Sequence, residues 1–199
     1  TAAVGLLLTL LAFFNDRSRL TQAEETEFEL RAGAVATALD KGIRDHLEIL
    51  FSLQGLYAAS EEVSSEGFHA FVQDALRRHP GIRAVEWAPR IERSRRRDFE
   101  RELPILELGP NGLLSPASDR EEHFPIRFVE PLAGHAFVLG FDLASEAVRR
   151  STLVRACDTG QPSGTGRLAL LQGMPGFLVF LPIFQDGSRE VTGTCLAVF

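Results

Sequence analysis

A glutamate at the end of a predicted strand raises the first question about chemistry in this chain. Glu130 comes directly before Pro131 and ends a strand-like segment that starts at Phe124. Because successive side chains of a strand point to opposite faces, Glu130 should share a face with Phe128, and Arg127 should point away from any pocket there. A carboxylate on this face suits a ligand with an amine, amide or heterocyclic N–H donor. The alternative is a strand-end carboxylate that caps a neighbouring amide.

The sequence contains no motif that would bring catalytic groups together. Side-chain catalysis needs a nucleophile beside a base, paired carboxylates or a metal cluster. The five histidines are scattered, with no pair four residues apart and no H-E-x-x-H. The glycine-rich residues 161–166 lack the G-x-x-x-x-G-K of a P-loop. The remaining combination, His123 with Glu121 and Glu122, is weak, so we predict that the chain is not an enzyme and holds no metal or cofactor.

Composition limits the class of protein and of partner. The 199 residues are 45% hydrophobic, which is enough for a core in one domain or in two small lobes. The formal net charge of −6 disfavours nucleic acid as a partner, since that affinity comes mainly from neutralising phosphates. Cys157 and Cys195 are too few for a disulfide framework or a zinc site. We expect two separate thiols, with a single disulfide as the alternative in an extracytoplasmic chain.

The N-terminal residues predict a membrane anchor followed by a long helix. Residues 1–14 carry no charge, yet a spanning helix needs roughly 20 apolar residues, so we interpret them as a transmembrane helix trimmed at its N-terminal side. A signal peptide and a buried core helix are the alternatives. Residues 15–59 contain no proline, and their apolar residues recur at three- and four-residue steps. That pattern indicates an amphipathic helix close to a heptad seam.

Helices and strands are expected to alternate through the remainder of the chain. Helices are predicted from Ser64 or Ser65 to His79, over the charged residues 92–103, and from a cap at Asp142 or Ser145 to a glycine stop at Gly160. Strands are predicted over residues 82–88, 124–130, 136–141, 168–172, 177–184 and 191–199. The segments 124–130 and 136–141 are expected to form a hairpin.

A series of short motifs runs from Phe68 to the last residue. Each motif is weak alone, but their order and spacing together are specific. The series is Phe68-x-x-Phe71, His79-Pro80-Gly81-Ile82, Trp87-Ala88-Pro89, Asp98-Phe99-Glu100, Phe124-Pro125-Ile126, Glu130-Pro131, Leu139-Gly140-x-Asp142-Leu143, Arg149-Arg150, Ala156-x-Asp158-Thr159-Gly160, Leu168-x-Leu170-x-Gln172, Pro182-Ile183 and Ala197-x-Phe199. In this respect the chain resembles the CHASE domain, the extracytoplasmic sensory module of receptor histidine kinases and nucleotide cyclases.

The resemblance implies an α+β fold, with a long N-terminal helix followed by two PAS-like α/β lobes with antiparallel sheets. On this basis we divide the chain into a truncated transmembrane helix (1–14), a dimerisation or stalk helix (15–59), a membrane-distal ligand lobe (60–155) and a truncated membrane-proximal lobe (156–199). The resemblance further implies flanking transmembrane helices, a homodimer through the N-terminal helices and an output domain in the cytosol. The expected location is the cell membrane, with this domain in the periplasm of a bacterium.

The resemblance also implies where a small-molecule ligand would bind. Its expected polar contacts are a carboxylate aligned near Glu130 and a hydroxyl that falls at Thr165. Candidate apolar walls are Trp87, Phe124 and Phe128, since ligand pockets are mostly apolar with a few placed polar groups.

Each of these residues also has a structural interpretation, such as a turn hydroxyl for Thr165 and a core position for Trp87. Because Trp87 and Glu86 lie on opposite faces of their strand, only one of the two should line the pocket. A sensor predicts a closed pocket near Glu130. A non-binding adhesion or scaffolding ectodomain, which is the alternative function, predicts that the aromatic rings themselves fill that space.

Overall fold

The computed structural model describes residues 31, 33–35, 37, 41–60, 63–171, 173–185 and 188–199. The chain divides into two compact units, Thr1–Asp45 and His46–Phe199. The described residues of the first unit are helical, and the Thr37 hydroxyl donates to the Gly33 carbonyl at 2.8 Å. Across the described residues, no helix is both long and apolar enough to cross a membrane. The predicted transmembrane segment 1–14 and most of the first half of the predicted stalk lie outside the described residues.

The second unit begins with helical residues that continue to residue 58. The helices that follow are α2 (Ser65–Arg78), α3 (Arg96–Phe99) and α4 (Ala147–Thr159), with 3-10 turns η1 (Arg93–Arg95), η2 (Ala136–Val138) and η3 (Leu143–Ser145). The strands are β1 (Ala84–Pro89), β2 (Ile91–Glu92), β3 (Leu106–Leu108), β4 (Leu114–Pro116), β5 (Glu122–His123), β6 (Phe128–Glu130), β7 (Ser163–Gly164), β8 (Leu168–Ala169), β9 (Pro175–Gly176), β10 (Leu178–Phe184) and β11 (Val191–Val198).

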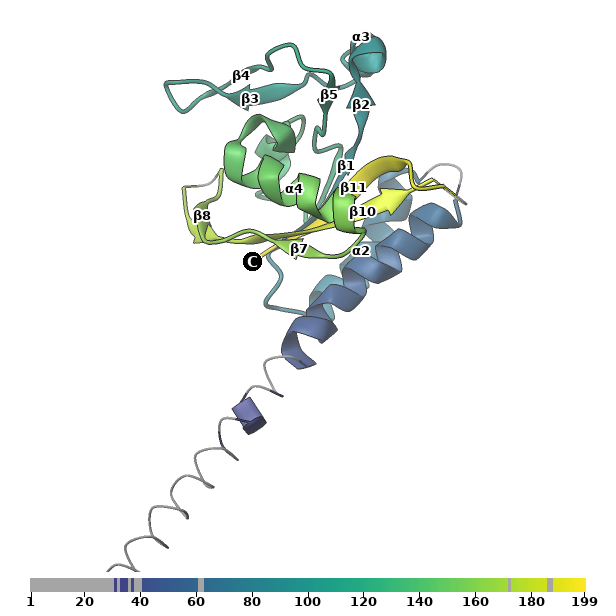
Figure 1. The fold of residues 1–199 in the computed structure, drawn as a ribbon, viewed down its shortest axis with the longest axis vertical. Helices are drawn as coiled ribbons and strands as arrows, with labels where there is room; N and C mark the ends of the chain where they lie inside the picture. Colours follow the sequence, from purple (N-terminus) through teal and green to yellow (C-terminus); the bar gives the residue numbers. More distant parts are fainter. Residues whose placement is uncertain are drawn as a thin grey trace, which may run out of the picture. The chain divides into compact units, whose positions relative to one another are not determined.

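A five-stranded antiparallel sheet in the order β6-β1-β11-β10-β7 forms the centre of this unit (Figure 1). In its register Trp87 pairs with Cys195 on one side and with Phe128 on the other. This arrangement confirms the predicted α+β class with antiparallel sheets. It contradicts the division into lobes at residue 155, because β1 and β6 precede that residue whereas β7, β10 and β11 follow it. The predicted proximal lobe in fact supplies the middle of the sheet.

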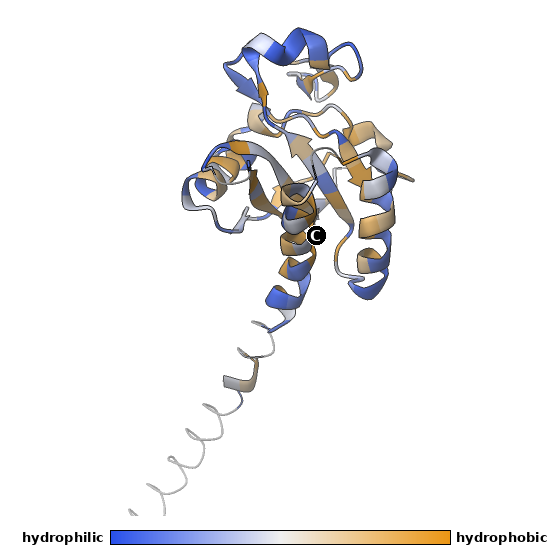
Figure 2. Cartoon of the chain, turned by 90° about the vertical axis from the view of Figure 1, so that its right-hand side faces the viewer, coloured by the Kyte–Doolittle hydropathy of each residue, from blue (hydrophilic) through white to orange (hydrophobic). Residues whose placement is uncertain are grey.

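Each face of the sheet carries its own hydrophobic core, because the side chains of β1 alternate between the two. Val85 and Trp87 face the helix that ends at residue 58 and α2, whereas Ala84 and Ala88 face α4. Figure 1 shows α4 on one side of the sheet and the other two helices on the opposite side. In Figure 2 the strands are largely hydrophobic, while the uppermost segment, around α3, is mostly hydrophilic.

The helix that ends at residue 58 packs on the sheet through a short buried stripe. Ile49, Leu50 and Leu53 are 0–3% exposed and belong to the core on the α2 side. Their spacing of one, three and four residues places them on one helical face. Phe51 of the same helix remains exposed. The predicted amphipathic pattern therefore has a direct structural counterpart from residue 49 onward.

Capping chemistry explains the ends of the two longer helices. Ser64 accepts a hydrogen bond from the Gly67 amide at 3.1 Å, so α2 begins where the sequence predicts. Glu146 caps α4 by accepting from the Val148 amide at 3.0 Å, whereas the predicted cap Asp142 serves η3 instead. Gly160 adopts φ 67° at the end of α4, in the left-handed region that favours glycine.

Two other predicted elements are wrong. The charged residues 92–103 form only a 3-10 turn and the single turn of α3. The predicted hairpin is also absent: of residues 124–130 only Phe128–Glu130 form a strand, and that strand pairs with β1, while η2 replaces the expected return strand. Within the intervening turn Gly134 adopts φ 81°. Gly140, inside the expected return strand, adopts φ 81°, and this left-handed conformation breaks the extended backbone that the strand needs.

Candidate functional site

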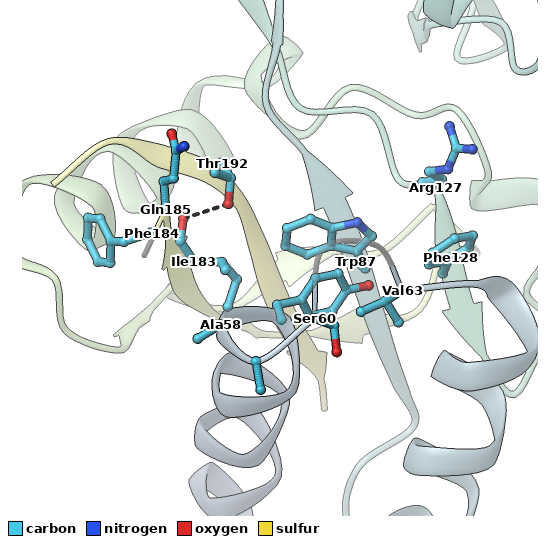
Figure 3. Close-up of a pocket in the computed structure, with 12 residues that line it drawn as sticks. Ala58, Ser60, Val63, Trp87, Arg127, Phe128, Ile183, Phe184, Gln185 and Thr192 are labelled. Carbon is cyan, nitrogen blue, oxygen red and sulfur yellow. Dashed lines mark hydrogen bonds between the residues drawn. The ribbon is translucent and has the colours of Figure 1, made fainter. Parts of the chain in front are cut away.

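A hollow opens on the α2 side of the sheet, where the end of the helix at residue 58 meets the sheet (Figure 3). We call it the Trp87 hollow. Its volume is about 710 Å³, which lies within the usual range of small-molecule sites. Its lining combines Tyr57 from the helix, Trp87 from β1, Phe128 from β6, and Ile183 and Thr192 from β10 and β11.

Two aromatic rings stack at the wall of the hollow. The Trp87 and Tyr57 ring centroids lie 4.1 Å apart with an interplanar angle of 27°. Gly193 makes room for this pair, since a Cβ atom there would lie 2.4 Å from Cη2 of Trp87 and 2.6 Å from the Ala88 carbonyl oxygen. The stack joins a helix to the sheet, so the wall of the hollow is built from both elements.

Two residues that line the hollow carry hydrogen-bond donors, Tyr57 and Arg127. The Tyr57 hydroxyl is buried and has no hydrogen-bond partner among the described residues. Burial raises the pKa of Tyr57, and the Cys195 thiol adds to that rise while Arg127 opposes it, so the hydroxyl is neutral at physiological pH. Arg127 lines the same hollow; its Nη2 donates to Glu102 Oε2 at 2.8 Å. A ligand acceptor placed between these donors would satisfy the Tyr57 hydroxyl.

A second hollow of about 500 Å³ adjoins the first and shares Arg127 and Phe128 with it. Glu130 lines this second hollow with 7% exposure, and its Oε2 lies 2.7 Å from Nδ1 of His69. His69 comes from α2, and no pattern in the sequence singles it out. The Glu130 carboxylate is thus partnered within the fold, and its other oxygen has no hydrogen bond among the described residues.

The structure brings together three of the five predicted ligand contacts, Glu130, Trp87 and Phe128. Thr165 lies beyond β7, at the opposite edge of the sheet from β6, four strand spacings or roughly 19 Å away. Its hydroxyl accepts from the Leu178 amide at 2.9 Å and so secures the edge strand. The prediction that Thr165 shares a pocket with Glu130 is therefore wrong.

Phe124 and Arg127 also lie differently from the prediction. Phe124 is 4% exposed and packs in the core on the α4 side, away from both hollows. Arg127 lines both hollows, although strand alternation places it elsewhere. The reason is that β6 begins only at Phe128, so the alternation rule does not apply to Arg127. Its guanidinium instead lies 5.7 Å from the ring centroids of Phe99 and Phe128.

In the weak catalytic combination at residues 121–123, the side chains make contacts within the fold. His123 is fully buried and its Nδ1 lies 2.8 Å from Asp142 Oδ2, while Glu122 accepts from Arg90 at 2.7 Å. The structure also leaves Cys157 and Cys195 as free thiols, and burial raises the pKa of Cys157 to about 11. Within the described part of the chain no group of three or more potential ligands could hold a metal ion.

Comparison with known sequences identifies one family and one relative. The family model described as the CHASE domain matches residues 61–199. The hybrid signal transduction histidine kinase A of Dictyostelium discoideum is 24% identical over 168 residues, a match that covers 80% of this chain and 8% of the kinase. The chain therefore spans less than a tenth of that relative.

Two solved structures superpose on most of this chain. An extracellular ligand binding receptor from Desulfohalobium retbaense DSM5692 superposes with a TM-score of 0.53 at 12% identity, covering 82% of this chain and 23% of that one. The ligand binding domain of the Pseudomonas aeruginosa PAO1 amino acid chemoreceptor PctC, in complex with GABA, gives a TM-score of 0.44 at 10% identity, covering 80% and 55%. At these identities the first likeness concerns the fold alone.

Proposed function

The chain belongs to the CHASE domain family, and from this membership we propose that it is the extracytoplasmic ligand-binding sensor of a transmembrane signalling receptor. In this proposal the receptor is a homodimer through its N-terminal helices, anchored in the cell membrane, with the domain in the bacterial periplasm. A cytosolic output domain outside this chain receives the signal.

The observation that carries the proposal is the Trp87 hollow with its unpartnered Tyr57 hydroxyl. A buried hydroxyl without a partner costs free energy of about 1–3 kcal/mol, which a ligand acceptor would recover. We propose that Trp87 and Phe128 contact the apolar body of the ligand. Tyr57 and Arg127 would donate hydrogen bonds to an acceptor on the ligand, and Glu130 would accept a hydrogen bond from a ligand donor that reaches into the adjoining hollow. A scaffolding ectodomain would have this space filled by the rings themselves.

The signal in this proposal travels through the helix that carries Tyr57. A ligand in the Trp87 hollow contacts both the helix and the sheet, so its affinity depends on how the two pack against each other. Only a difference in affinity between two packings can shift their equilibrium. The favoured packing would then shift or rotate the helix against its partner in the dimer and so act across the membrane.

A ligand screen with three variants tests the proposed site. We expect compounds that bind to raise the melting temperature and to change the fluorescence of Trp87, the sole tryptophan of the sequence. Tyr57→Phe removes one neutral hydrogen bond and should weaken binding up to about tenfold, while Arg127→Gln removes a charged donor and should weaken it by roughly 10- to 100-fold. The control Arg97→Gln alters an exposed arginine and should leave affinity unchanged.

Two outcomes would contradict the proposal. A screen of periplasmic metabolites without a single stabilising compound would favour the scaffolding alternative. Compounds that bind equally well to Tyr57→Phe, Arg127→Gln and the unmodified protein would show that the ligand site lies elsewhere.

A further inference from the structure

A third hollow opens on the α4 side of the sheet, on the face opposite the Trp87 hollow. Its volume is about 460 Å³, which lies within the usual range of small-molecule sites. Phe124 and Leu153 on its floor are buried in the core of that side, and the half-buried Cys157 and Val191 pack against the same core. We call it the Arg150 hollow, after the arginine at one end of its wall.

One face of α4 forms a wall of this hollow. Arg150, Val154 and Asp158 follow one another at intervals of four residues and therefore share a helical face. All three are exposed, Val154 by 48%. The hollow is thus open to solvent along α4, and a small molecule can enter it without moving a buried side chain.

The two ends of the hollow have different surroundings. α4 ends beside the connection between β10 and β11, since a Cβ atom on Gly160 would lie 3.7 Å from Cζ of Phe184. Residues 189–190, an arginine and a glutamate of that connection, line the hollow and therefore lie at its Asp158 end. Arg150 lies at the other end, about 12 Å from Asp158 along the helix axis.

Charges of both signs meet at the Asp158 end. The hydrogen bond to Glu122, at 2.7 Å, and the nearby charge of Glu190 raise the pKa of Arg90. Burial, Glu122 and Asp158 raise the pKa of Cys157, whereas Arg90 opposes that rise. Because acids and arginines are mixed here, this end suits an uncharged apolar group better than a second anionic group of a ligand.

Arg150 supplies an open positive charge at the other end. Its guanidinium makes no hydrogen bond or ion pair among the described residues. Two further charged residues of the lining are already paired, Arg120 with Glu107 and Glu121 with Arg93. The Arg150 guanidinium is therefore available to an anionic group that enters the hollow.

We propose that the Arg150 hollow is a second ligand site, which binds a small apolar monocarboxylate. The ligand carboxylate would pair with the Arg150 guanidinium, whose planar fork matches a carboxylate. The aliphatic chain would lie over Leu153 and Val154 and point toward Cys157. The site is separate from the Trp87 hollow and does not depend on the function proposed there.

Calorimetric titration of the whole chain with hexanoate tests this site. Hexanol lacks the charge and should bind about two- to fivefold more weakly, because an ion pair at an exposed arginine contributes modestly. Hexylamine, with the opposite charge, and adipate, with a second carboxylate, should also bind more weakly than hexanoate. Arg150→Gln should weaken hexanoate binding about two- to fivefold. Arg189→Gln, at the Asp158 end, and the exposed control Arg97→Gln should each change it by less than about twofold.

The Cys157 thiol reports where hexanoate binds. Cys195 is 0% exposed, so N-ethylmaleimide should modify only Cys157 in the folded chain. Hexanoate should slow this reaction in proportion to the fraction of protein bound, and it should do so less in Arg150→Gln at the same concentration.

Four results would overturn the second site. The first is the absence of heat and of any protection of Cys157 with hexanoate in excess. The second is equal affinity for hexanoate and hexanol, or a larger loss in Arg189→Gln than in Arg150→Gln. The third is tighter binding of 6-aminohexanoate than of hexanoate, which would show that the Asp158 end selects a cation. The fourth is hexanoate binding that Tyr57→Phe weakens and Arg150→Gln does not, which would place the ligand in the Trp87 hollow and support the sensor proposal alone.

Discussion

Glu86→Gln is expected to stabilise the protein by about 4 kcal/mol at pH 8 and by less than about 1 kcal/mol at pH 5. Burial raises the pKa of Glu86 from 4.5 to about 8 in the folded protein. Between these two values the folded state holds a proton that the unfolded state has released. Stability of the unmodified protein should therefore fall as pH rises through this window, and glutamine, which mimics the protonated acid, should not show that loss.

Urea denaturation of both proteins at pH 5, 6, 7 and 8 measures this effect. The difference between the two unfolding free energies cancels the titration of the histidines, because both proteins share them. A constant difference across this range would mean that Glu86 titrates as an exposed carboxyl, and the protonated state assigned to it would then be incorrect.

Leu53→Ala is expected to destabilise the protein by about 3 kcal/mol, because removing a fully buried leucine loses transfer free energy and leaves a cavity. Leu53 is 0% exposed in the core between the helix and the sheet. Phe51 on the same helix is 46% exposed, and Phe51→Ala should cost less than about 1 kcal/mol. Both changes introduce alanine into the same helix, so their effects on helix propensity are similar. The difference between the two losses of stability therefore measures burial against the sheet.

Equilibrium urea unfolding of the two variants, with the slope of the transition unchanged, provides the comparison. Equal losses of stability for Leu53→Ala and Phe51→Ala would indicate that the helix does not rest on the sheet as described. The sensor mechanism depends on this contact, because it is the surface through which a filled hollow would act on the helix.

The sequence predicts local structure well where the cause is local. The Ser64 hydroxyl fixes the start of α2 and Gly160 fixes the end of α4, and both signals are visible within a few residues. Alternation along β1 also correctly places Trp87 and Glu86 on opposite faces, because that strand is long enough and central in the sheet.

The sheet itself could not be predicted in the same way. Pairing of β1 with β11 joins segments about a hundred residues apart, and no local pattern specifies that partnership. The PAS-like division at residue 155 fails for this reason. Strands of two or three residues, such as β6 and β7, are also too short for a period-two signal to place a neighbouring side chain such as Arg127.

The candidate site was predictable only in part, for the same physical reason. Glu130, Trp87 and Phe128 lie together because β6 pairs with β1 in the register that places Trp87 opposite Phe128. Thr165 lies apart because β7 joins the far edge of the sheet, which depends on β10 and β11. Tyr57 belongs to the predicted helical stripe, but only the fold shows that it lines a hollow and that its buried hydroxyl has no partner among the described residues.

Hydrogen–deuterium exchange of the helical residues 46–58 tests most directly whether a filled Trp87 hollow acts on the helix. The measurement compares the free protein with the protein saturated by a compound whose binding depends on Tyr57 and Arg127. Slower exchange in this helix on binding, with a smaller change in Tyr57→Phe at equal saturation, is the predicted result. Unchanged exchange at full saturation would contradict the proposed link between the ligand and the helix.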